Sequence, residues 1–156
     1  MLDLYEEFSL LVNEFENSSI EYALCGGLAV SVHGFVRATI DIDFVVLAED
    51  IDKIWNLVRR LGYLVEAVPM VMSKGMIKIY RYTKIEQDSG DFISLDCLVL
   101  SEELNSLWDK RERLPFENGF VKVLNKSALI ELKMLRNSFQ DKQDIQNLKG
   151  ETDETN

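Results

Sequence analysis

The stretch CGGLAVSVHGFVRATIDIDFVVL, residues 25–47, decides how the rest of the chain is interpreted. Its last part is rich in β-branched and aromatic residues and predicts a buried strand, yet Asp41 and Asp43 stand within it. Burying one unpaired carboxylate is costly, and placing a second beside it adds mutual repulsion. A compensating group must therefore lie next to the two aspartates, and the identity of that group points to the function.

Two carboxylates in this pattern are suited to holding a metal. Side chains alternate along a strand, so Asp41 and Asp43 share one face while Ile42 and Phe44 anchor the opposite face in the core. Such a pair can hold one or two Mg²⁺ or Mn²⁺ ions, because hard cations prefer oxygen ligands, and a bound cation removes the repulsion. The alternative is that Asp41 begins the strand at its solvent-exposed end and caps a turn, and that no metal binds.

A glycine pair precedes the aspartates. Gly26 and Gly27 follow a predicted strand and precede a predicted short helix, so they allow a sharp turn. They also allow a phosphate to approach backbone N–H groups near a helix N-terminus, although the glycines alone are equally typical of an ordinary turn. Arg37 is close enough in sequence to reach a phosphate, or else to pair with Asp43. The combination predicts a site for a metal-bound polyphosphate.

The length and composition favour a compact protein. The 156 residues most simply form one domain, expected at residues 1–149, with a frayed acidic tail at 150–156. No apolar run approaches the roughly 20 residues that span a bilayer, and the N-terminus lacks the zones of a secretory signal. We therefore expect a cytoplasmic protein without membrane segments, in which Cys25 and Cys97 are reduced and buried.

The net charge of −10 argues against extended duplex nucleic acid as a partner. Proteins that bind duplexes usually carry a basic balance, because neutralisation of phosphates dominates their affinity. The visible basic clusters are only Arg59–Arg60 and the group Lys110, Arg111 and Arg113. A polyanionic partner would have to use one of these small patches.

The rest of the sequence mixes helix and strand patterns without strict alternation. Helical patterns cover residues 2–17, 28–35, 49–63, 102–110, 125–137 and 140–148. Strand patterns cover residues 20–25, 39–47, 63–70, 76–83 and 91–100, with a hairpin at 113–124 about Asn118–Gly119. This mixture predicts an α+β fold, a mixed β-sheet of about four to six strands with helices packed against it.

The same residues carry a resemblance to a known family. Gly-Gly, a gap of about a dozen residues and Asp-apolar-Asp in an apolar strand resemble the nucleotidyltransferase superfamily of DNA polymerase β. The motif His-Gly-x-x-Arg-x-Thr at residues 33–39 is similar to small prokaryotic members, among them the toxin-like nucleotidyltransferases of abortive-infection and toxin–antitoxin systems. The likeness reaches the closing helices, but only residues 26–43 are specific.

The resemblance implies a nucleotidyltransferase-like fold and a reaction, the transfer of a nucleoside monophosphate from a nucleoside triphosphate such as ATP onto a hydroxyl. Asp41 and Asp43 would hold the metals, and a third carboxylate from a neighbouring strand would join them and serve as base. Asp96 is the match for that carboxylate and Asp91 the fallback. Lys133 would lie near the triphosphate, the alternative being a solvated surface lysine. The acceptor stays open between a protein side chain, a small molecule and a tRNA end, and the toxin-like branch implies an antitoxin-like partner protein.

Two other functions use the same residues. A non-catalytic relative would bind a nucleotide or a partner protein, and a magnesium-dependent phosphohydrolase would direct water instead of an acceptor. The products separate the three hypotheses. The transferase hypothesis also makes two structural demands: the acidic side chains must share one face, and no permanent arginine or lysine contact may block them.

Overall fold

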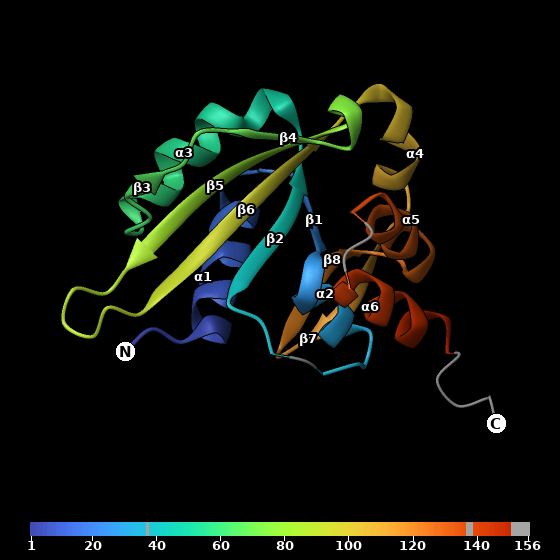
Figure 1. The fold of residues 1–156 in the computed structure, drawn as a ribbon. Coiled ribbons are helices and arrows are strands. Elements are labelled where there is room, and N and C mark those ends of the chain that lie inside the picture. Colours follow the sequence, from blue (N-terminus) through green and yellow to red (C-terminus); the bar gives the residue numbers. More distant parts are fainter. Residues whose placement is uncertain (37, 137–138, 151–156) are drawn as a thin grey trace.

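The fold is a mixed β-sheet with helices packed on it (Figure 1). The structure is a computed structural model that describes residues 1–36, 38–136 and 139–150. Its helices are α1 (Leu4–Asn17), α2 (Gly26–Val32), α3 (Ile51–Arg60), α4 (Asn105–Trp108), α5 (Lys126–Arg136) and α6 (Phe139–Lys149). Its strands are β1 (Tyr22–Cys25), β2 (Asp41–Val46), β3 (Val65–Glu66), β4 (Met70–Met72), β5 (Ile77–Ile85), β6 (Phe92–Leu100), β7 (Arg111–Phe116) and β8 (Gly119–Leu124).

The strands follow the order β3-β5-β6-β2-β1-β8-β7, and β4 also pairs with β5. The pairs β2·β6 and β1·β8 are parallel and the others antiparallel, so the predicted mixed sheet is confirmed. Within the described residues the sheet has eight strands, more than the four to six expected. One reason is that residues 63–70, predicted as one strand, contribute to two short strands that both pair with β5.

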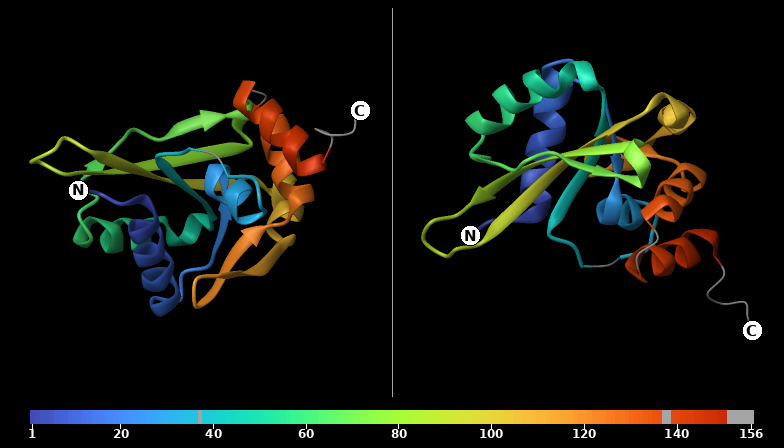
Figure 2. Two further views of the ribbon diagram at one scale, coloured as in Figure 1. Left: turned by 90° about the horizontal axis from the view of Figure 1, so that it is seen from below. Right: turned by 45° about the horizontal axis from the view of Figure 1, so that its top comes forward.

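Helices α1 and α3 lie on one face of the sheet, and α5 and α6 lie on the other side of it (Figure 2). The first face is held by aromatic contacts: the ring of Phe44 in β2 lies 5.3 Å from Phe15 of α1 and 5.2 Å from Tyr22, and Trp55 of α3 stacks on Tyr82. Burial of such large rings is a main source of folding free energy. This face is the one that the sequence assigned to the core.

Local features of the sequence agree with the structure, apart from a shift of one residue in the hairpin turn. Helix α3 ends just before Gly62, whose φ of +102° takes the backbone out of the helical conformation. The β7–β8 hairpin forms, although its turn is at Glu117 and Asn118, one residue earlier than predicted, because β8 already begins at Gly119. Cys25 and Cys97 are buried and unbridged. Among the described residues, no helix combines the length and the apolar character needed to cross a membrane.

Candidate active site

Three carboxylates share one face of two adjoining strands. Asp41 is the first residue of β2 and Asp43 lies two residues further along. Strand β6 runs parallel to β2 and places Asp96 directly beside Asp43. Paired residues of neighbouring strands project to the same side, so all three side chains point away from the aromatic core. The first structural demand of the transferase hypothesis is met.

Asp43 fits there only because its neighbour is a glycine. Gly26 has φ of +70°, in the left-handed region that side chains disfavour. A Cβ at Gly26 would lie 2.6 Å from Cγ and 2.8 Å from Cβ of Asp43, closer than real contacts allow. Helix α2 begins at Gly26, so the glycines form its first turn and do not precede it as predicted. At least one function of Gly26 is therefore to admit the Asp43 side chain.

The Asp43 carboxyl has an electrostatic environment that opposes its charge. Burial, then the nearby carboxylates of Asp96 and Asp41, raise its pKa from the ordinary 3.8 to about 7. The residue is 9% exposed. Within the described part of the chain, no side chain lies within hydrogen-bond or ion-pair distance of this carboxyl. The more distant charges of Arg136 and Lys133 lower its pKa by less than burial and the two carboxylates raise it, so a cation at the site would supply the remaining compensation.

Asp96, in contrast, has a partner that the sequence analysis missed. Arg81 of β5 lies directly opposite Asp96 in the antiparallel β5–β6 register. Its Nε donates to Asp96 Oδ1 at 2.7 Å and its Nη2 to Oδ2 at 2.8 Å, a bidentate pair. The second demand, that no arginine contact blocks the acids, is thus not met for Asp96. A carboxylate offers about four lone-pair sites, so two remain for another ligand.

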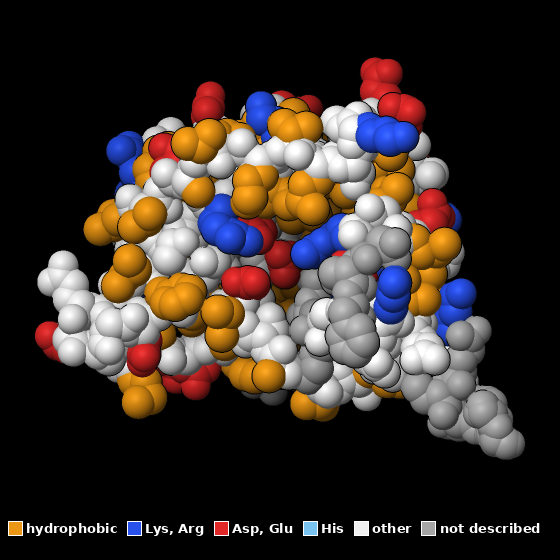
Figure 3. All heavy atoms as spheres, in the orientation of Figure 1, with side chains coloured by type: hydrophobic (Ala, Val, Ile, Leu, Met, Phe, Trp, Pro, Cys, Tyr) orange, Lys and Arg blue, Asp and Glu red, His pale blue; other side chains and the backbone are white. Residues whose placement is uncertain are grey.

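The carboxylates open into a cavity of about 140 Å³ between the sheet and helices α5 and α6. This volume suits a metal with phosphate oxygens and is smaller than the roughly 300 Å³ at which whole-ligand pockets begin. Figure 3 shows acidic and basic side chains gathered in a hollow at the centre of this face. The lining residues are Gly26, Gly27, Thr39, Asp41, Asp43, Arg81, Asp96, Lys133, Arg136, Gln140 and Asp141.

Lys133 lines this cavity, but it is buried and already paired with acidic side chains, so it does not offer its charge to a triphosphate. It is 3% exposed, and its Nζ lies 3.1 Å from Asp144 Oδ2 and 3.8 Å from Asp141 Oδ1. Both aspartates belong to α6 and are buried, so the three charges join α5 to α6. The alternative of a surface lysine is wrong, and contact with a triphosphate would require Lys133 to exchange partners.

Two further predicted residues have different outcomes. Asp91 lies before β6 in the turn that links it to β5, where its N–H bonds to Ser89 Oγ at 3.1 Å, so it is a turn residue. Arg37 lies outside the described residues, and its role stays a prediction. Gly27 is buried in α2 and lines the cavity.

The donor set fits a hard divalent cation such as Mg²⁺ or Mn²⁺. All three side chains offer oxygen, and Arg136 and Lys133 compensate the buried charge of Asp43 only in part. Over residues 1–36, 38–136 and 139–150, however, no three acidic, histidine or cysteine side chains are already close enough together to enclose an ion. Metal binding would therefore require the carboxylates to draw together, as they can when substrate phosphates and water supply the remaining ligands.

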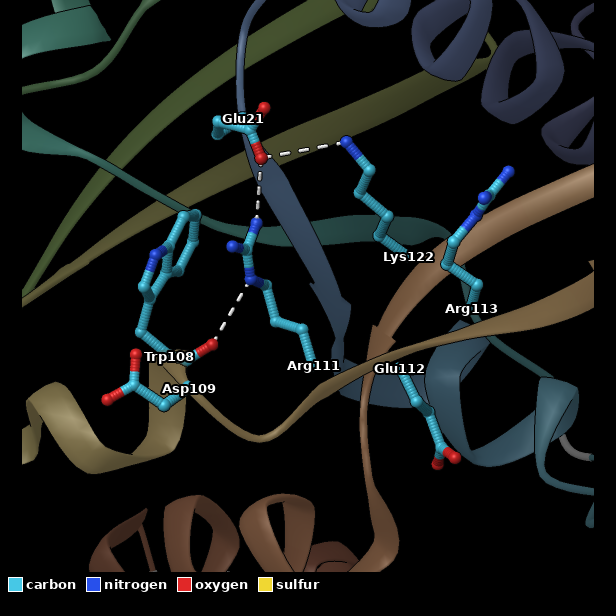
Figure 4. A pocket seen from close by; sticks show the side chains of 7 residues that line it. All are labelled: Glu21, Trp108, Asp109, Arg111, Glu112, Arg113 and Lys122. Atoms are coloured by element: carbon cyan, nitrogen blue, oxygen red, sulfur yellow. Dashed lines mark hydrogen bonds and ion pairs between the residues drawn. The ribbon is translucent and has the colours of Figure 1, made fainter.

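Two members of the basic cluster at residues 110–113, Lys110 and Arg111, are paired internally, and Figure 4 shows the contacts of Arg111. Arg111 Nη1 donates to Glu21 at 3.0 Å and its guanidinium lies 3.9 Å from the Trp108 ring centre, while Lys122 lies 3.6 Å from the same Glu21. The hydrogen bond from Arg111 holds the pKa of Glu21 below its ordinary value. Lys110 pairs with Glu131. Basic side chains that are already paired with acidic ones form a poor binding surface for a polyanion.

The fold matches solved nucleotidyltransferases. A Thermotoga maritima protein whose assignment as a nucleotidyltransferase is provisional aligns over 94% of this chain and 92% of its own, with 12% identity and a TM-score of 0.61. The lincosamide antibiotic adenylyltransferase LnuA, solved with lincomycin bound, aligns over 92% and 95%, with 18% identity and a TM-score of 0.58. ANT(2'')-Ia, solved with adenylyl-2''-tobramycin, aligns over 92% and 86%, with 14% identity and a TM-score of 0.63.

At these identities the likeness concerns the fold. No protein-family model matches the sequence, and no protein of curated function does so either. The chain has the nucleotidyltransferase fold, and the resemblance predicted from residues 26–43 is confirmed at that level. The toxin-like branch of the resemblance stays a prediction.

Proposed function

We propose that this chain is a metal-dependent nucleotidyltransferase that moves a nucleoside monophosphate from a nucleoside triphosphate onto a hydroxyl. The observation that carries the proposal is the convergence of Asp41, Asp43 and Asp96 on one face of β2 and β6, beside a cavity. The raised pKa of Asp43 supports it, since functional carboxylates are often buried beside like charges. The nucleotidyltransferase fold provides the second support.

In this proposal each residue has a stated role. Asp41, Asp43 and Asp96 would hold Mg²⁺ or Mn²⁺, which when bound would neutralise phosphate charge and activate the acceptor oxygen. Gly26 and Gly27 would leave room for the triphosphate. The acceptor oxygen bonds to the α-phosphorus as the bond to the pyrophosphate oxygen breaks, and the hydroxyl proton passes to a carboxylate, for which Asp96 is the candidate.

Of the three acceptor classes, a small hydroxyl compound has the best support. Lincomycin and an adenylylated tobramycin occupy two structures of the same fold. The charge of −10 and the internally paired basic residues disfavour an RNA acceptor. A toxin-like role and an antitoxin-like partner rest on the sequence resemblance alone.

One observation favours a second candidate, the non-catalytic binding relative. The bidentate pair of hydrogen bonds from Arg81 to Asp96, called the fork below, is the kind of contact that would persist in a site that no longer binds metal. If the fork is permanent, the chain would bind nucleotide weakly or not at all and would release no pyrophosphate. The two candidates differ in their products, so one assay separates them.

The test is to incubate the protein with Mg²⁺, the four α-³²P-labelled ribonucleoside triphosphates and a cell extract, and to follow label and pyrophosphate together. We expect label to appear on an acceptor with matching pyrophosphate release, and to disappear in Asp43→Asn. Asp88→Asn, which removes an exposed carboxylate from the β5–β6 turn, is the matched control. Free phosphate without labelled acceptor would identify a phosphohydrolase, and no product of either kind would favour the binding relative.

A further inference from the structure

The bidentate contact between Arg81 and Asp96 is the strongest feature of the site that the proposed reaction does not use. The two donor–acceptor distances of 2.7 and 2.8 Å are those of a charge-assisted fork. Asp96 is almost enclosed, with 6% of its side chain exposed, whereas 40% of the Arg81 side chain is exposed. One partner is therefore fixed in the cavity wall and the other stands at its entrance.

Arg81 also stands among an excess of negative charge. Asp41, Asp43 and Asp96 all act on its guanidinium and raise its pKa further above the ordinary value, the hydrogen bonds to Asp96 first. Without a metal, this guanidinium is the cation that compensates Asp96. A metal bound by the three carboxylates would compete with Arg81 for the same oxygens, and two cations side by side would repel each other.

We propose that Arg81 is a positioning residue that makes metal binding depend on nucleotide. With no nucleotide present, the fork holds Asp96 away from the metal ligands, and the site binds divalent cations weakly. When a triphosphate enters with its metal, the guanidinium exchanges Asp96 for phosphate oxygens, and Asp96 becomes free to join Asp41 and Asp43. This inference rests on the proposed function.

The chemistry of arginine supports such an exchange. A guanidinium presents a planar set of donors that matches carboxylate and phosphate equally well, so the same fork can pass from one to the other. The side chain is partly exposed, so it can turn without displacing the packed core. The coupling is reciprocal: if nucleotide favours metal binding, metal favours nucleotide binding by the same factor.

The first experiment measures Mn²⁺ binding to the full chain by calorimetry with no nucleotide present. Arg81→Gln should tighten Mn²⁺ binding by on the order of tenfold, less than a fully buried pair would give because Arg81 is partly exposed. Arg81→Lys keeps the charge and loses the fork, so its affinity should fall between the two. Lys78→Gln removes the same charge from the opposite face of β5, where Lys78 is exposed, and should leave Mn²⁺ affinity unchanged.

The second experiment measures binding of adenosine 5′-(α,β-methylene)triphosphate, and of its guanosine, cytidine and uridine counterparts, with Mg²⁺ present. Arg81→Gln should weaken the tightest of these by about fivefold, because a phosphate loses its fork. If Arg81 only orients Asp96, Arg81→Gln would bind Mn²⁺ no better than the wild type, which overturns the inference. Failure of the proposed function looks different, since Asp43→Asn and the wild type would then bind Mn²⁺ and nucleotide equally.

Discussion

Gly26→Ala is the substitution whose cost the structure defines most closely. The left-handed backbone at Gly26, with φ of +70°, costs a residue with a side chain roughly 1–2 kcal/mol. The new methyl group would lie 2.6 Å from Cγ and 2.8 Å from Cβ of Asp43, so Asp43 and its strand must shift. Forcing a methyl group into filled space adds roughly 1–3 kcal/mol. We therefore expect the free energy of unfolding to fall by about 2–5 kcal/mol.

Gly90→Ala separates these two contributions. Gly90 has a similar φ of +77°, but a Cβ there meets no heavy atom within 4 Å apart from its chain neighbours, so only the backbone cost of roughly 1–2 kcal/mol applies. Both substitutions restrict the unfolded chain in the same way, so that effect cancels in the comparison. Urea unfolding followed by circular dichroism measures both. Equal destabilisation by the two substitutions would mean that the approach of Asp43 does not require a glycine at position 26.

Two further predictions concern buried charge. Because the fold raises the pKa of Asp43 from 3.8 to about 7, the folded protein binds its proton more firmly than the unfolded chain does; this adds stability below about pH 4 that is lost as pH rises through 7. In urea titrations Asp43→Asn should therefore be more stable than the wild type by about 2 kcal/mol at pH 5 and by about 4 kcal/mol at pH 8; an equal difference at both pH values would contradict this. Lys133→Met should lower the free energy of unfolding by roughly 3–5 kcal/mol because it removes the cation from buried Asp144, whereas Lys110→Met, in an exposed pair of the same 3.1 Å length, should cost less than about 1 kcal/mol. Thermal or urea unfolding of both variants measures this, and similar losses would show that burial does not set the cost.

The parts of the site that the sequence predicts are those fixed by local geometry. Strand alternation alone places Asp41 and Asp43 on one face and Phe44 on the other, as the structure has them. The position of Asp96 beside Asp43 depends on pairing between β2 and β6, which no single segment of sequence specifies. Here the family resemblance supplied what periodicity could not.

Arg81 was missed because nothing local distinguishes it. Within MIKIYRYT it is one polar residue of an ordinary alternating strand. Its role follows only from the register that sets it opposite Asp96, a contact between residues 15 positions apart.

The burial of Lys133 could have been predicted from its position in the helical pattern. Leu129, Leu132 and Lys133 have the spacing of one helix face, so the lysine shares the buried stripe. Asp141 and Asp144, three residues apart on the next helix, supply the acidic partners that a buried lysine needs. Read together, these residues predict an ion cluster between two closing helices, with no surface lysine.

The proposed function depends on the acids of β2 binding a nucleotide through a divalent cation. The most direct measurement is a titration of the wild type, Asp41→Asn and Asp43→Asn with nucleoside triphosphate, with Mg²⁺ and then with excess chelator, after circular dichroism has shown that all three are folded. The wild type should bind the triphosphate only with Mg²⁺, and both variants should lose this binding. Equal affinity in all three proteins, or binding that persists in chelator, would show that the aspartates are structural.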